Sequence, residues 1–119
     1  MRSIIFTFLL VSFPVIATET MICNYDRFSD KKGSHKENLS LTYVIDRETE
    51  KTYLVGNNGS SEVLSIPNIK GASFVEVTGS GNVMTTTIDA ERFSVHSRHS
   101  IGFDGTLLPS QYYGYCIDK

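Results

Sequence analysis

The chain has 119 residues, a formal net charge of −2, 40% hydrophobic residues and 20% charged residues. This length allows one domain with its own core, and the share of apolar side chains excludes an intrinsically disordered chain. Because there is no cationic excess, the composition argues against a protein that binds nucleic acid through its phosphates.

Residues 1–17 have the features of an export signal. Arg2 supplies a positive charge, the run from Ile4 to Phe13 is almost wholly apolar, and Ala17 takes the −1 position of a cleavage site. The run is too short to cross a bilayer of about 30 Å as a helix, and an uncleaved N-terminal anchor is the alternative. We expect cleavage, one domain over residues 18–119, no stable membrane span after cleavage, and a periplasmic or secreted location.

The rest of the chain consists of short runs of alternating apolar and polar residues separated by turn residues. No helical period is sustained, and this pattern is typical of antiparallel β-structure. After the first strand we expect a polar loop from Asp26 to Asn38. The predicted strands are 20–25, 39–45, 51–55, 62–66, 72–78, 83–88, 93–101 and 112–117. Seven to eight strands joined by hairpins predict an all-β fold, either a small antiparallel meander barrel or a barrel-like sandwich.

The two cysteines lie near the two ends of the exported chain. Export implies an oxidising environment, so we predict a disulfide between Cys23 and Cys116. It would join the first and last strands, which favours a closed barrel. The alternative, two free thiols with a metal or catalytic role, has no neighbouring cysteine to support it.

The strand predicted over residues 93–101 holds two of the three histidines. Alternation places Phe93, Val95, Ser97, His99 and Ile101 on one face, and Ser94, His96, Arg98 and Ser100 on the other. The first set is the more apolar, so we expect Ser97 and His99 to point into the core. His96 and Arg98 would then point to solvent. Diverging histidines argue against a metal site, which needs three or four converging ligands, and we expect no metal and no cofactor.

Arg98 is the best candidate for binding in this strand, because a planar guanidinium suits a carboxylate or a phosphate. A cross-strand pair with Glu76 or another acid is the alternative. Ser97 as nucleophile and His99 as base would make a hydrolase, but no turn presents the serine. A partly buried, hydrogen-bonded His99 is the simpler interpretation, and we expect no catalysis.

Three tyrosines fall within the four residues from Tyr112 to Tyr115. Tyr113 and Tyr115 share a face that Tyr112 does not. Such a cluster can form a platform for a ligand, or it can close one end of a small β core. The candidate binding residues are therefore His96, Arg98, His99, Tyr112 and Tyr113.

Four motifs follow one another in the chain. They are Tyr53–Gly59 (YLVGNNG), Thr85–Asp89 (TTTID), Ser94–His99 (SVHSRH) and Pro109–Cys116 (PSQYYGYC). Together with the export signal they resemble small exported β-rich proteins of Gram-negative bacteria. This resemblance implies a periplasmic or secreted location and brings no activity with it.

The size, the export signal and the end-to-end cystine are also similar to those of bacterial lysozyme inhibitors of the small β-barrel kind. That likeness is one of fold and compartment. Inhibition would need a protruding polar loop, supplied by residues 57–61 or 79–82.

The leading hypothesis is a monomeric, exported β-barrel that binds an unknown protein or envelope component. The alternatives are a lysozyme-inhibitor-like protein of the cell envelope, a structural envelope protein without a discrete ligand, and a hydrolase that uses Ser97 and His99.

Overall fold

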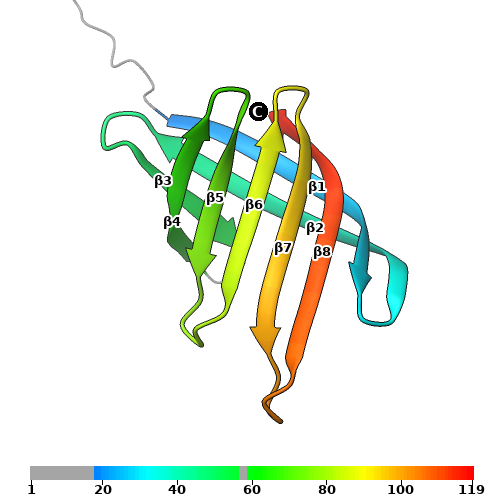
Figure 1. Cartoon of the computed structure of the whole chain (residues 1–119). Coiled ribbons are helices and arrows are strands. Elements are labelled where there is room, and N and C mark those ends of the chain that lie inside the picture. Colours follow the sequence, from blue (N-terminus) through cyan, green and yellow to red (C-terminus); the bar gives the residue numbers. More distant parts are fainter. Residues whose placement is uncertain (1–17, 57–58) are drawn as a thin grey trace, which may run out of the picture.

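The computed structural model describes residues 18–56 and 59–119, and the predicted signal peptide lies outside the described residues. Eight strands form a closed antiparallel barrel in which each strand pairs with its neighbours in the chain (Figure 1). They are β1 (Thr18–Asp30), β2 (Gly33–Asp46), β3 (Lys51–Gly56), β4 (Gly59–Asn68), β5 (Gly71–Val77), β6 (Val83–Asp89), β7 (Phe93–Ile101) and β8 (Leu107–Asp118). The prediction of an all-β meander barrel is confirmed. Residues 18–56 and 59–119 contain no helix that is long and apolar enough to cross a membrane.

The predicted polar loop from Asp26 to Asn38 is wrong, because β1 and β2 continue through it as a long hairpin. A bulge between Tyr25 and Arg27 shifts the register of β1, and such a bulge hides the alternation of side chains from sequence inspection. Beyond the bulge, Phe28 pairs with His35, and their rings lie 4.8 Å apart. β8 also begins earlier than predicted, at Leu107.

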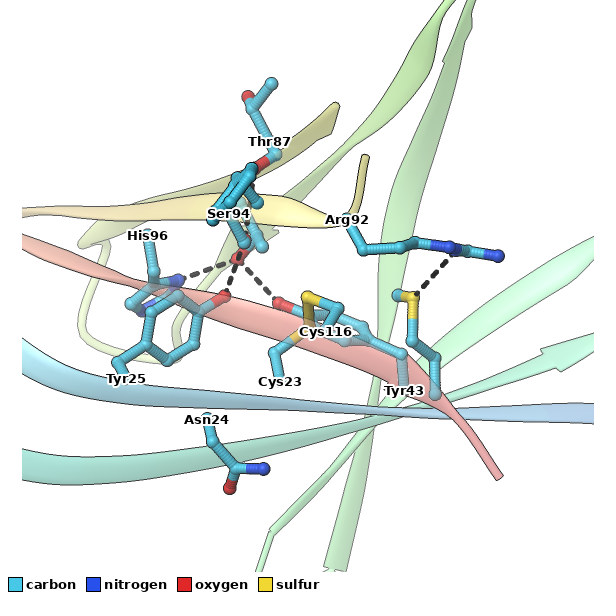
Figure 2. The surroundings of a disulfide bond; sticks show 12 residues. Cys23, Asn24, Tyr25, Tyr43, Thr87, Arg92, Ser94, His96 and Cys116 are labelled. Carbon is cyan, nitrogen blue, oxygen red and sulfur yellow. Dashed lines mark hydrogen bonds between the residues drawn. A yellow bond between two sulfur atoms is a disulfide. The ribbon is translucent and has the colours of Figure 1, made fainter. Parts of the chain in front are cut away.

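The predicted disulfide is confirmed. Cys23 and Cys116 face each other directly in the register of β1 and β8, and their sulfurs are bonded across 93 residues of chain. Both side chains are fully buried. The bond therefore holds together the two strands that close the barrel (Figure 2).

The barrel has two ends, which Figure 1 shows at the top and bottom. The upper end carries the β4–β5 and β6–β7 connections and the last residues of β8. The lower end carries the β5–β6 and β7–β8 hairpins. The buried core between them consists of Met21, Cys23, Tyr25, Tyr43, Val63, Phe74, Ile88, Tyr112 and Cys116.

Candidate functional site

The two faces of β7 are the reverse of those expected. Ser94 and His96 are buried on the inner wall of the barrel, and Arg98 is half-buried on the same wall. His99, expected to point inward, is exposed on the outer wall. The alternation along the strand was predicted correctly and its direction was not, because hydrogen-bonding partners on the inner wall stabilise the polar set there.

A chain of hydrogen bonds crosses the barrel interior from Tyr43 to Arg98. The hydroxyl of Tyr43 lies 2.6 Å from that of Thr86, and the Thr86 hydroxyl lies 2.7 Å from Nδ1 of His96. The Nε–H of Arg98 donates to Nε2 of His96 at 3.2 Å. Because a guanidinium can only donate, Nε2 must accept, and His96 is neutral with its proton on Nδ1. Burial, and then the charge of Arg98, lower the pKa of His96 to about 4.

A second pair of hydrogen-bonded side chains, Ser94 and Tyr25, lies in the interior next to the disulfide (Figure 2). Ser94 donates to the backbone carbonyl of Thr87 at 3.1 Å, so its oxygen accepts from the hydroxyl of Tyr25 at 2.8 Å. Burial raises the pKa of both Tyr25 and Tyr43. Every buried side-chain nitrogen and oxygen in the described part of the chain has a hydrogen-bond partner. The middle of the barrel therefore contains hydrogen-bonded polar side chains, and we refer to these side chains together as the polar network.

Arg98 lies at the lower side of this network, against aromatic side chains. Its guanidinium lies over the ring of Tyr112 at 4.9 Å, and that ring also stacks on Phe28 at 5.1 Å. Tyr112 is buried, so it closes the core and also forms a surface for the arginine.

The alternative of an ion pair between Arg98 and Glu76 is wrong. Met84 pairs with Glu76 on one side and with Arg98 on the other, so two strand spacings, roughly 10 Å, separate the backbones of the two residues. No carboxylate of residues 18–56 and 59–119 lies within 4.0 Å of the Arg98 nitrogens. The two terminal nitrogens of the Arg98 guanidinium are therefore available to bind an anion, and the planar fork of arginine is well suited to this.

Two of the candidate binding residues lie apart from this site. His99 and Tyr113 point outward, and the ring of Tyr113 is covered by Arg27 at 5.6 Å. A surface depression of about 270 Å³ lies beside His99, between β1, β7 and β8. The structure therefore brings together His96, Arg98 and Tyr112, and it separates His99 and Tyr113 from them.

The hydrolase alternative receives no geometric support. Ser97 and His99 share one face as expected, but it is the outer face and not the inner one, and among the described residues no hydrogen bond joins them. No three side chains of His, Cys, Asp or Glu in the described ranges converge in a way that could hold a metal ion.

Sequence inspection missed the residues that surround His96 and Arg98. Tyr43 lies in the strand predicted over residues 39–45, but nothing in its neighbours in the chain indicates Thr86 as a partner 43 residues away. Phe28 fell within a supposed loop. The useful signal was the tyrosine-rich last strand, which supplies Tyr112.

No family model, no curated protein and no solved structure matches this chain. The structure defines the class of the protein: a small eight-stranded meander barrel closed by one disulfide between its first and last strands.

Proposed function

We propose that this protein is an exported binding module without catalytic activity, and that its barrel binds an anionic group of the ligand, a carboxylate or a phosphate, at Arg98. The observation that carries the proposal is the half-buried guanidinium over Tyr112, with no carboxylate of the described residues within 4.0 Å of its nitrogens. Partial burial of an uncompensated charge is unfavourable, and an anionic ligand would remove that cost.

The surroundings of Arg98 support binding because they restrict its movement. The hydrogen bond to His96 and the stack on Tyr112 orient the guanidinium plane before any ligand arrives. A side chain that is already ordered loses less conformational entropy on binding. His96 is in this view a positioning residue, and Arg98 and Tyr112 are the residues that touch the ligand.

Two further observations support the location and the lack of catalysis. Disulfides are rare in reducing compartments, so the bond between Cys23 and Cys116 favours a periplasmic or secreted protein. The only buried imidazole among the described residues, that of His96, already makes hydrogen bonds through both nitrogens. It is therefore poorly placed to act as a base.

The test uses the methyl groups of the methionines as reporters, because Met84 is paired with Arg98 and Met21 lies near the upper end. Inorganic phosphate and succinate are titrated separately at constant ionic strength into protein labelled with ¹³C at the methionine methyl groups. We expect a saturable shift of the Met84 signal and none of the Met21 signal.

Variants complete this test. Arg98→Ala should abolish the Met84 shift, and Arg98→Lys should weaken it, because lysine lacks the planar fork. Arg27→Ala is the matched control, since Arg27 also covers a tyrosine but on the outer wall. The proposal is wrong if neither anion moves Met84, or if Arg98→Ala leaves the shift unchanged in a protein that still unfolds cooperatively.

The anionic group belongs either to a free small molecule or to an acidic side chain of an envelope protein. A pull-down from envelope extract with the wild type and Arg98→Ala distinguishes these sources. A protein that is captured by the wild type and lost in the variant indicates an acidic protein partner. Phosphate or succinate binding without such a protein indicates a small ligand.

A lysozyme-inhibitor-like role is the second candidate, because two hairpins project at the lower end. The tip of the β7–β8 hairpin carries a fully exposed Phe103, and hydrogen bonds of Thr78 and Asn82 brace the β5–β6 turn, which includes the expected loop 79–82. Of the other expected loop, residues 57 and 58 lie outside the described residues. A lysozyme activity assay with the wild type and Phe103→Ser tests this role; unchanged lysozyme activity would exclude it for the enzyme used.

A further inference from the structure

The upper end of the barrel, which Arg98 does not face, contains a pocket of about 360 Å³. Its floor is apolar and is formed by Met21, Ile45, Ala72, Phe74 and Ile88. Most of this floor is the upper surface of the buried core. The volume lies within the range of about 300–1,000 Å³ in which small-molecule sites fall, and barrel mouths are a frequent place for them.

The one guanidinium among the residues that line this pocket is already engaged. Arg92 donates to Oδ2 of Asp118 at 2.5 Å, and its other terminal nitrogen lies 3.8 Å from the sulfur of Met21. Arg92 therefore covers part of the apolar floor and is paired with a carboxylate. It is not free to receive an anionic group.

The other charged groups of the rim are carboxylates. Oδ1 of Asp89 accepts backbone N–H groups of the β6–β7 turn, at 2.9 Å each, and its second oxygen makes no hydrogen bond with any described residue. Glu19, which also lines the pocket, is paired with Arg47 at 2.6 Å. The opening is therefore surrounded by three carboxylates and two guanidinium groups, and the charge of the rim is negative. The carboxylates are those of Glu19, Asp89 and Asp118, and the guanidinium groups are those of Arg47 and Arg92.

We infer that the upper pocket is a second binding site, and that its ligand is a small amphiphile with an apolar body and a cationic, amine-type head. The apolar body would cover Met21, Phe74 and Ile88, which removes apolar surface from water. The head would lie at the rim beside Asp89, where the unpaired carboxylate oxygen accepts its hydrogen bond. The site is independent of Arg98, because the polar network in the middle of the barrel separates the two.

The experiment compares hexylammonium, hexanol and hexanoate, titrated at constant ionic strength into the oxidised protein labelled at the methionine methyl groups. We expect hexylammonium to shift the Met21 signal and to leave the Met84 signal in place. It should bind up to about fivefold more tightly than hexanol, because exposed ion pairs contribute only modestly. Hexanoate should bind more weakly than hexanol.

Two variants test the floor and the rim separately. Ala72→Leu fills the pocket and should abolish the Met21 shift, whereas Ser73→Leu, one residue further on the outer wall, should not. Asp118→Asn removes one carboxylate and frees Arg92, so it should move the preference toward hexanoate without the packing change of Ala72→Leu.

The inference is overturned if Met21 does not respond to hexylammonium, or if Met21 and Met84 shift together, which would mean non-specific binding. It is also overturned if hexanoate binds as tightly as hexylammonium, or if folded Ala72→Leu retains the shift. A negative result for the upper pocket does not contradict the proposal for Arg98, because binding at Arg98 is measured by the Met84 signal in titrations with anions.

Discussion

Arg98 and His96 are two residues apart on β7, and the Nε–H of Arg98 donates to Nε2 of His96 at 3.2 Å inside the barrel. The bond requires a neutral imidazole, because a protonated His96 would offer a second donor to a permanent cation. The charge state of one buried histidine is therefore linked to the position of the residue that we propose binds the ligand.

The free energy of unfolding should fall when the pH is lowered from about 6.5 to 4. The folded pKa of His96 is about 4, below its ordinary value of 6.5, so the unfolded chain takes up a proton in this window and the folded chain does not. Stability is complete above pH 6.5, and a loss of about 3 kcal/mol is expected by pH 4. Urea unfolding at pH 7.0, 6.0, 5.0 and 4.5 measures it.

Matched variants assign this pH dependence. His96→Gln should remove it between pH 6.5 and 4.5, whereas His99→Gln, which changes the exposed histidine on the same strand, should leave it unchanged. Glu19, Asp30 and Asp104 have lowered pKa values because of their hydrogen bonds, and their stabilisation is lost as the pH falls from their ordinary values of 4.5 and 3.8 through the lowered ones, so they contribute mainly at the acid end of this window and in all variants alike. An unaltered slope in His96→Gln would show that another group is responsible.

Thr86→Val should destabilise the barrel more than Tyr43→Phe. The Thr86 hydroxyl contacts both Tyr43 and His96, so the valine leaves two buried polar groups without a partner, at a cost of about 3 kcal/mol. Tyr43→Phe removes one end of the chain and leaves Thr86 bonded to His96, at a cost of about 1 kcal/mol. Thr87→Val on the outer wall is the control. Equal destabilisation by all three variants would contradict the network.

The reversal of β7 shows where sequence reasoning succeeds and where it ends. Alternation correctly predicts that His96 and Arg98 share one wall and that Ser97 and His99 share the other. The choice of wall depends on partners such as Thr86, which lies on the neighbouring strand. The polar side chains of β7 are stable inside the barrel only because residues of other strands form hydrogen bonds with them. The neighbours of β7 in the sequence do not reveal those partners.

Barrel closure could be predicted from the sequence, whereas the long β1–β2 hairpin and the upper pocket could not. Closure was predictable because Cys23 and Cys116 lie near opposite ends of a chain of hairpins. The long β1–β2 hairpin was not, because the bulge after Tyr25 breaks the alternation and the segment beyond it is mostly polar. The upper pocket was also unpredictable, since its floor comes from residues of four strands that lie between Met21 and Ile88 in the chain.

Removal of the disulfide should lower the stability of the barrel substantially. The bond closes a loop of 93 residues, for which the chain-entropy model gives a contribution of about 4.6 kcal/mol. The double variant Cys23→Ala/Cys116→Ala should therefore unfold at a clearly lower urea concentration. Wild-type protein unfolded in the presence of dithiothreitol is the control and should behave similarly. An unchanged midpoint in both would mean that the bond does not stabilise the closed barrel.

Gly114→Ala should be the most damaging of the small substitutions, because β1 and β8 approach each other closely at this position. A Cβ at Gly114 would overlap the carbonyl oxygen of Asn24 and lie 2.7 Å from Cα of Tyr25. Both obstacles are backbone atoms next to the bulge and the disulfide, so they cannot rotate away as a side chain could. We expect a loss of about 3 kcal/mol.

Gly79→Ala is the matched control, since a Cβ at Gly79 meets nothing within 4 Å. Its unfolding midpoint should stay close to that of the wild type. Thermal unfolding of both variants, followed by circular dichroism, measures the difference. Because Gly114 pairs with Ser94 on its other side, Gly114→Ala should also disturb the hydrogen bond of Ser94 to Tyr25 and raise the amide exchange rate of β1 beside the bulge. Equal midpoints for the two alanine variants would mean that β1 does not press on β8 at this crossing.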